Sequence, residues 1–268
     1  MPYENIDVVA IAAAAGVAVA VAALAILKKL LTPAATAVAA VILVTATVFT
    51  GYAGLVLYAG AFLLSGVISL AGKKKRAERE EGIHKRTGTR GVVQVICNGL
   101  PALVFAAVWF STGIQSFYTA FVASLAAGFA DSAASDIGIL SRRTARSILT
   151  FRPVKRGLSG GVTALGTLSA LAGAIFVAAL ALPFGNGYGA VYFAIAFAAA
   201  FAATLADSVL GASLQALYRC DECGELTEKE IHCGAPTTLI RGARVMDNDL
   251  VNFISLIFAG ALAAAVVL

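Results

Sequence analysis

The sequence contains little charge. Asp, Glu, Lys and Arg make up only 13% of its 268 residues, whereas 60% are hydrophobic and the mean hydropathy is +0.88. A soluble domain is about half apolar and about a quarter charged. This composition therefore excludes a soluble globular protein, and we expect an integral membrane protein.

The sequence also lacks the patterns of several enzyme classes. It contains only two histidines, and no combination of nucleophile, base and acid stands out for covalent catalysis. It has no Walker A motif. The net charge of +5 would suit nucleic acid, but membrane topology explains it equally well, so we expect no nucleic-acid partner.

Eight apolar segments are long enough to cross a hydrocarbon core of about 30 Å, which takes roughly 17 to 25 helical residues. They cover residues 8–27, 33–50, 52–71, 91–111, 117–138, 161–182, 191–217 and 250–268. The sequence thus predicts an all-α, polytopic transmembrane bundle that forms a single domain over residues 1–268. No basic region precedes the first segment, so we expect it to remain as a span.

All 20 Lys and Arg residues fall in four connecting segments, within residues 28–29, 73–90, 142–156 and 219–244. With eight spans these segments lie on one face of the membrane, and the positive-inside rule makes that face cytoplasmic. Both termini are then expected outside the membrane, in a multi-pass protein of the cell membrane.

Polar residues are unevenly distributed along the chain. The first three spans, within residues 1–72, contain no interior acid, amide or histidine, so we expect them to be a packing scaffold. Residues 73–90 read as a solvated basic loop, with a short surface helix over 73–81 as the alternative. Polar side chains gather at the cytoplasmic ends of the spans within 91–268. This one-sided clustering favours an active site at the membrane surface over a transport pathway.

The tripeptide Ala-Asp-Ser occurs twice, around Asp131 and Asp207, each time near the end of an apolar span. Acids in membrane helices are costly and usually functional. Carboxylate oxygens suit Mg²⁺, so we expect Asp131 and Asp207 to be catalytic metal ligands, together with Asp136. A straight helix would not place Asp131 and Asp136 on one face, so we expect a break or bend near Ser135 if both bind one ion. Pairing of Asp136 with Arg142 or Arg143 is the alternative.

A basic, glycine-rich turn leads into the sixth span. Backbone N–H groups of such a turn and a helix start can bind phosphate, and Lys and Arg add positive charge. The alternative is an ordinary turn with topogenic charge. We expect Lys155 to act in catalysis and the following residues to contact nucleotide: Arg156, Gly157, Ser159, Gly160, Gly161 and Thr163.

Further polar residues lie at the same depth. The last span opens with four polar residues, Asp247, Asn248, Asp249 and Asn252. A helix cap would need only one of them, so Asp247 and Asp249 are additional candidate Mg²⁺ ligands and the two asparagines are candidate nucleotide contacts. Three further residues complete the predicted nucleotide site, namely Asn98, Ser135 and Gln215.

The cytoplasmic segment 218–247 contains Cys220, Cys223, His232 and Cys233. These are four possible ligands for Zn²⁺. The adjacent His-Cys pair makes four-ligand binding awkward, and reduced cytosolic thiols are the alternative.

The sequence resembles the integral-membrane phytyl-phosphate kinase family, and the matching stretches run in family order across most of the chain. They are residues 88–95, Asn98-Gly99, the run Ala130-Asp131-Ser132-Ala133-Ala134-Ser135-Asp136-Ile137-Gly138, residues 155–162, residues 207–212 with Gln215, residues 246–249, and Val251-Asn252. A shorter likeness, within 131–138, links the chain to dolichol kinases and CDP-diacylglycerol synthases.

The resemblance implies a Mg²⁺-dependent kinase that prefers CTP and phosphorylates a prenyl monophosphate, such as phytyl or geranylgeranyl phosphate, to the diphosphate. Its partners would be a nucleotide and a prenyl lipid. A kinase acting on the free prenol or polyprenol is one alternative. A lipid or ion transporter that uses the buried acids for coupling is an alternative of another class.

Overall fold

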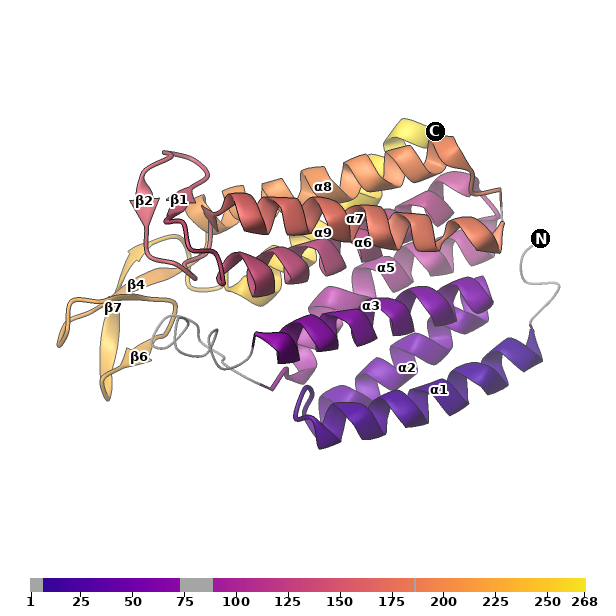
Figure 1. Ribbon diagram of the computed structural model, residues 1–268, viewed down its shortest axis with the longest axis horizontal. Helices are drawn as coiled ribbons and strands as arrows, with labels where there is room; N and C mark the ends of the chain where they lie inside the picture. Colours follow the sequence, from indigo (N-terminus) through magenta and orange to yellow (C-terminus); the bar gives the residue numbers. More distant parts are fainter. Residues whose placement is uncertain (1–6, 73–88, 186) are drawn as a thin grey trace.

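The computed structural model describes residues 7–72, 89–185 and 187–268. In these residues eight long helices run side by side along an elongated bundle (Figure 1). In chain order they are α1 (Val8–Leu27), α2 (Pro33–Thr50), α3 (Tyr52–Ala71), α5 (Val92–Thr112), α6 (Gln115–Gly138), α7 (Ala164–Leu180), α8 (Ala190–Ser213) and α9 (Asn248–Val267). A short 3₁₀ helix, Leu182–Phe184, follows α7.

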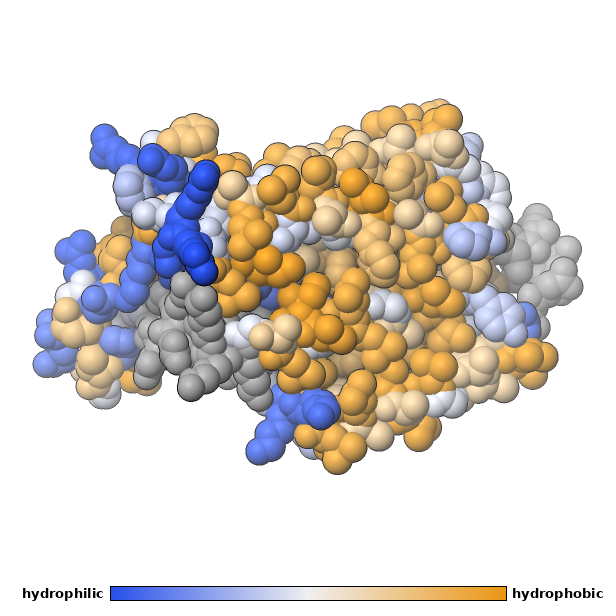
Figure 2. Space-filling view, viewed as in Figure 1, coloured by the Kyte–Doolittle hydropathy of each residue, from blue (hydrophilic) through white to orange (hydrophobic). Residues whose placement is uncertain are grey.

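Seven of these helices are long and apolar enough to cross a membrane, and α6 is the exception among the described helices. Figure 2 shows apolar residues over most of the helical surface and hydrophilic residues at the end that carries the β-strands. The predicted polytopic helical bundle is thus confirmed.

Helix α6 lies at the centre of the bundle, in contact with α3, α5, α7, α8 and α9. Its side chains Tyr118, Phe121 and Val122 are fully buried. A helix surrounded by protein needs no lipid-facing apolar surface, which explains why α6 tolerates more polar residues than its neighbours. The bundle therefore places the Asp131 helix in the middle.

Small residues let α6 and α7 approach closely. A Cβ atom at Gly138 would lie 3.1 Å from the Cα atom of Gly166, and one at Gly173 would lie 3.2 Å from the Cα atom of Ala130. Helix α6 continues unbroken to Gly138. The structure therefore shows no break in α6 near Ser135.

Two small antiparallel sheets lie in the segments that connect the helices. The first contains β1 (Ala145–Ser147), β2 (Pro153–Val154) and β3 (Gly161–Val162), in the order β2-β1-β3. The second contains β4 (Leu217–Cys220), β5 (Leu226–Thr227), β6 (Ile231–His232) and β7 (Ala235–Arg241), in the order β5-β4-β7-β6. These sheets are a small addition to the predicted helical bundle, and they form because backbone groups outside the helices pair with one another.

The sheets also correct two predicted span boundaries. Gly161 lies in β3, and α7 begins only at Ala164, because the Thr163 hydroxyl caps it by accepting from the Gly166 N–H at 3.1 Å. Helix α8 ends at Ser213, and Leu217 begins β4 rather than ending a span.

Both sheets lie at one end of the bundle, whereas α1 begins and α9 ends at the other (Figure 1). The helix considered over residues 73–81 lies outside the described residues, as does most of the basic segment 73–90.

Candidate functional site

A cavity of about 390 Å³ lies at the sheet-bearing end of the bundle. It is lined by residues of α3, α5, α6, α7, α8 and α9 and by the glycine-rich turn between β2 and α7. It gathers every residue predicted to bind Mg²⁺ or nucleotide, apart from Lys155: Asn98, Asp131, Ser135, Asp136, Arg156, Gly157, Ser159, Gly160, Gly161, Thr163, Asp207, Gln215, Asp247, Asn248, Asp249 and Asn252.

Acidic side chains outnumber basic ones around this cavity. Among the described residues its acids are Asp131, Asp136, Asp207, Glu228, Glu230, Asp247 and Asp249, and its bases are Lys29, Arg90, Arg156 and Arg244. An excess of carboxylates favours a bound cation, and oxygen donors are those that Mg²⁺ prefers. The donor set therefore fits Mg²⁺.

Asp131 of α6 and Asp207 of α8 are half-buried and close enough for their charges to interact. The amide of Asn252, which is only 5% exposed, lies beside them. In one orientation its nitrogen donates to Asp207 Oδ2 at 3.1 Å, and in the other it donates to Asn98 Oδ1 at 3.3 Å. Helices α5, α6, α8 and α9 thus meet at one polar cluster.

Asp136 has partners other than the two arginines considered from the sequence. It accepts a hydrogen bond of 2.5 Å from Ser69 Oγ of α3, and its Oδ2 lies 4.0 Å from Arg90 Nη2. The alternative that Asp136 pairs with Arg142 or Arg143 is not what the structure shows. Ser69 also brings α3 into the site, so the third span is more than scaffold.

Arg90 lies in one of the motif stretches, residues 88–95, but the sequence alone predicted no role for it. Its N–H donates to the Leu30 carbonyl at 2.9 Å, and its carbonyl accepts from the Thr32 N–H at 3.1 Å. These backbone bonds fix Arg90 to the connection between α1 and α2. Its position between Gly88 and Gly91, directly before the fourth span, is the sequence signal that could have identified it as a cavity residue.

The start of α9 has two functions. Asp247 caps the helix, because its Oδ1 accepts from the Leu250 N–H at 3.1 Å, and it also lines the cavity with Asn248. Asp249, in the first turn of the helix, is only 8% exposed. The simple capping interpretation therefore holds for Asp247 but not for Asp249.

The polar donors of the glycine-rich turn already have partners. The N–H and hydroxyl of Ser159 donate to Glu228 Oε1 at 3.1 and 2.6 Å, and Gln215 Nε2 donates to the Ser159 hydroxyl at 2.8 Å. Thr163 donates to the Gly138 carbonyl at 3.3 Å. A carboxylate thus takes the position at Ser159 that the sequence assigned to a phosphate, and Glu228 is a cavity residue that sequence reasoning missed.

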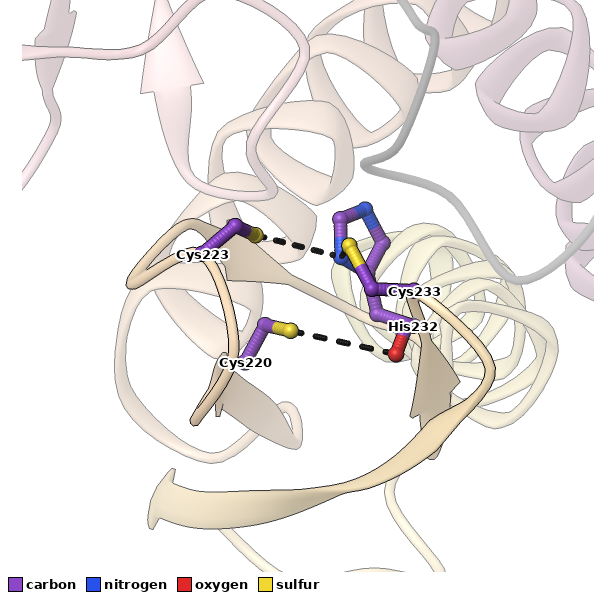
Figure 3. Close-up of side chains that lie close together, drawn as sticks. All are labelled: Cys220, Cys223, His232 and Cys233. Carbon is purple, nitrogen blue, oxygen red and sulfur yellow. Dashed lines mark hydrogen bonds between the residues drawn. The ribbon is translucent and has the colours of Figure 1, made fainter.

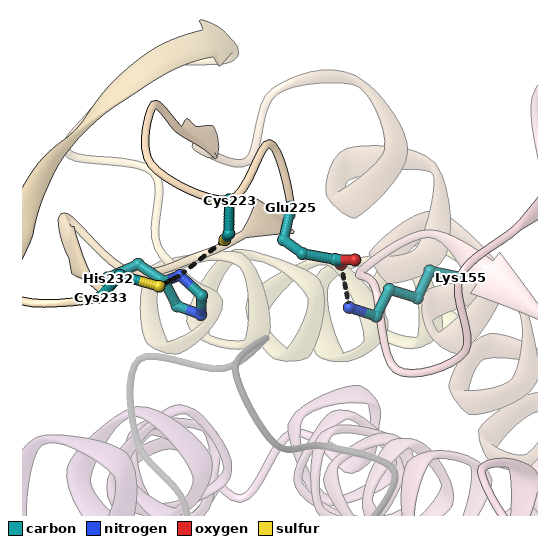
Figure 4. Close-up of polar contacts among 5 residues, drawn as sticks. All are labelled: Lys155, Cys223, Glu225, His232 and Cys233. Atoms are coloured by element: carbon teal, nitrogen blue, oxygen red, sulfur yellow. Dashed lines mark hydrogen bonds and ion pairs between the residues drawn. The ribbon is translucent and has the colours of Figure 1, made fainter.

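Lys155 does not line the cavity. Its ammonium forms an ion pair with Glu225 of the second sheet (Figure 4). The hydrogen bond from Lys155 lowers the pKa of the Glu225 carboxyl. The structure therefore gives Lys155 a contact between the two sheets, not one with the cavity.

The four candidate zinc ligands come together outside the cavity, in the second sheet (Figure 3). The N–H of Cys223 donates to the sulfur of Cys220 and lowers the pKa of that thiol to about 7. Contact with the Cys223 side chain raises the pKa of Cys233 to about 11.

The fold and this site define a polytopic membrane protein with an acidic cavity at one end. A family model described as "Integral membrane protein DUF92" matches residues 16–260. The chain therefore belongs to this integral membrane family, which confirms the family assignment made from the sequence motifs.

The chain is 30% identical to "Protein PGR" of Arabidopsis thaliana over 209 residues, which cover 69% of this chain and 70% of that protein. It is 34% identical to "Uncharacterized membrane protein MJ0933" of Methanocaldococcus jannaschii over 88 residues, 33% of this chain and 37% of that one. No solved structure matches the chain.

Gly160 packs directly against Ala212 of α8, so a substitution at Gly160 tests how much this contact matters for stability. Gly160 has φ +80°, and a Cβ atom there would lie 2.4 Å from the Cβ of Ala212. Gly160→Ala should therefore lower stability by the cost of the backbone conformation, about 1 kcal/mol, and by about 1–3 kcal/mol of overpacking. Thermal unfolding of the purified protein in detergent measures both together.

Gly224→Ala is the matched control, because Gly224 has φ +75° but nothing within 4 Å of its Cβ position. The Gly224→Ala variant should lose only the stability that the strained backbone conformation costs, about 1 kcal/mol. Equal losses in the two variants would contradict the role of the Ala212 contact.

Proposed function

We propose that this protein is a membrane-embedded, CTP-dependent kinase. It transfers phosphate to a prenyl monophosphate, such as phytyl or geranylgeranyl phosphate, at the cytoplasmic face of the cell membrane. One observation supports this above all: the acidic cavity borders an apolar one, and the two together suit a lipid with a charged head.

The apolar cavity has a volume of about 150 Å³ and lies among α1, α2, α3, α5 and α6. Its lining is largely Ala, Val, Leu and aromatic residues, including Ala22, Tyr58 and Phe62. It shares six residues with the acidic cavity, namely Leu31, Phe62, Arg90, Gln94, Asn98 and Ser132. The junction is therefore where a polar head would meet an apolar tail.

An amphiphilic substrate fits this arrangement. Its phosphate would contact Arg90, whose guanidinium suits phosphate oxygens, and its prenyl chain would enter the apolar cavity. That cavity is smaller than the roughly 300–1,000 Å³ of pockets that enclose a whole ligand, so the rest of the chain would lie in the bilayer. Spans one to three then contribute to substrate binding.

The acidic cluster provides the residues for metal and nucleotide. Asp131 and Asp207 would hold Mg²⁺, assisted by Asp136, Asp247 and Asp249. When bound, Mg²⁺ would neutralise charge on the transferring phosphoryl group. Arg156, Gly157, Gly161, Asn248 and the amides of Asn98, Gln215 and Asn252 would contact the nucleotide. Lys155 is left out, because its ammonium pairs with Glu225 away from the cavity.

Glu228 bears on how the nucleotide would bind. It occupies the N–H and hydroxyl donors of Ser159. A phosphate can use those donors only if Glu228 turns away, so Arg90 and Arg156 carry most of the proposed phosphate binding. The CTP preference itself rests on the family resemblance.

The kinase is tested by following phosphate transfer from labelled CTP, or ATP in parallel, to geranylgeranyl monophosphate in the presence of Mg²⁺. Asp131→Asn and Asp207→Asn should each lower turnover at least roughly 100-fold, the size of effect seen when one electrostatic group is removed from an active site. Both variants should still fold, because Asn keeps the shape of Asp.

Asp7→Asn is the matched control for these variants. Asp7 caps α1 at the opposite end of the bundle, and Asn caps helices equally well, so its turnover should equal that of wild type. Transfer only to the free alcohol would indicate a prenol kinase. Flux across vesicles without nucleotide consumption would contradict the kinase and support a transporter.

The apolar cavity is tested by filling it. Ala22 of α1 lines the cavity, whereas its neighbour Ala23 is exposed. Ala22→Phe should raise the KM for geranylgeranyl monophosphate about 10-fold or more, since one methylene already changes binding by about 1–3 kcal/mol. Ala23→Phe should leave the KM unchanged. Equal KM values for the two variants would contradict the proposal that the prenyl chain occupies this cavity.

A further inference from the structure

Four potential metal ligands converge in the second sheet. Cys220 ends β4, Cys223 lies in the turn that follows it, His232 ends β6, and Cys233 begins the next turn. Their ligand atoms all lie within 4.8 Å of one another. His232 Nδ1 is 3.5 Å from Cys223 Sγ and 3.3 Å from Cys233 Sγ (Figure 3).

The two separations between His232 and the sulfurs are close to those that a zinc ion requires, and the 4.8 Å limit leaves the four ligands only a small closure to make. In tetrahedral sites zinc lies about 2.3 Å from sulfur and about 2.0–2.1 Å from nitrogen, which puts neighbouring ligand atoms roughly 3.4–3.8 Å apart. Three sulfurs and one imidazole also complete the shell, as in structural zinc sites. We propose that Cys220, Cys223, His232 and Cys233 bind one structural Zn²⁺.

The backbone explains how adjacent residues can both be ligands. His232 pairs with Ala235 across the β6–β7 hairpin, so Cys233 and Gly234 form a two-residue turn. Their φ angles are +52° and +80°, and positive φ at both central positions is typical of a type I′ turn. This turn brings the Cys233 sulfur to the imidazole of His232. The strained backbone at Cys233, rare for a residue other than glycine, fits a ligand position.

The β4–β5 hairpin supplies the other two ligands, Cys220 and Cys223. Gly224 N–H donates to the Cys220 carbonyl at 2.8 Å, and Cys220 N–H donates to the Glu225 carbonyl at 3.0 Å. These bonds close a tight turn that carries Cys223 next to Cys220. Each hairpin thus contributes two ligands, and one ion would tie the two hairpins together.

The sheet needs such a tie, because it has little core of its own. Among the described residues, the buried apolar cluster at this sheet consists of Leu158 and Leu217, with Leu226 packed against them. Small units of this kind commonly depend on a structural metal. The predicted cytoplasmic location also favours a metal site over a disulfide for a Cys-x-x-Cys motif.

The zinc site would act on the cavity from a distance. Glu225, directly before β5, pairs with Lys155 (Figure 4). Glu228, directly after β5, accepts from Ser159. By fixing β4 and β5, zinc would hold both glutamates against the glycine-rich turn. The inference does not depend on the proposed kinase activity, because metal content is measured separately.

The test is to measure the zinc content of the whole protein by inductively coupled plasma mass spectrometry. The protein is purified without chelator from cells grown with added zinc. We expect about one zinc per chain in wild type. Cys223→Ser and Cys233→Ser should lose most of it. His232→Cys should keep it, since four cysteines also form structural zinc sites.

Cys97→Ser is the control for loss of a thiol. Cys97 lies in α5 outside the cluster, so its zinc content should equal that of wild type. A zinc-free wild type, or equal zinc in the Cys223→Ser variant, would overturn the proposal. An intact-protein mass showing a disulfide among these cysteines would do the same.

Discussion

The central constraint on this structure is electrostatic, because several carboxylates lie close together at one end of an apolar bundle and repel one another. Asp131 and Asp207 project from neighbouring helices into one cavity, where further acids outnumber the bases among the described residues. Arg90, Ser69 and the Asn252 amide offset part of this charge. In the proposed function a divalent cation would balance the remainder, which would tie the electrostatics of the cavity to the proposed chemistry.

The elements around the cavity combine packing with recognition. Helix α6 is buried by five neighbouring helices, and the glycine contacts that bring α7 close also place the Thr163 cap at the cavity. The glycine-rich turn is held by Ala212 on one side and by Glu228 of the second sheet on the other. The cavity is therefore shaped both by the helical bundle and by the two sheets at its end.

The helices were predictable because a long apolar segment has few alternatives in a membrane. The acids at the span ends were predictable because charge there is costly and calls for an explanation. Long-range pairs were not: nothing near Lys155 in the sequence points to Glu225, and nothing near Ser159 points to Glu228. The strands were missed because most are only two or three residues long, too short for a period-two pattern.

The measurement that tests the central claim most directly is calorimetric titration of CTP into the purified protein, with Mg²⁺ and then with EDTA. The account predicts binding with Mg²⁺ and none without it, because the acidic cavity repels a bare nucleotide. It also predicts that Asp131→Asn weakens the binding that depends on Mg²⁺. Equal binding in EDTA, or none in either condition, would contradict it.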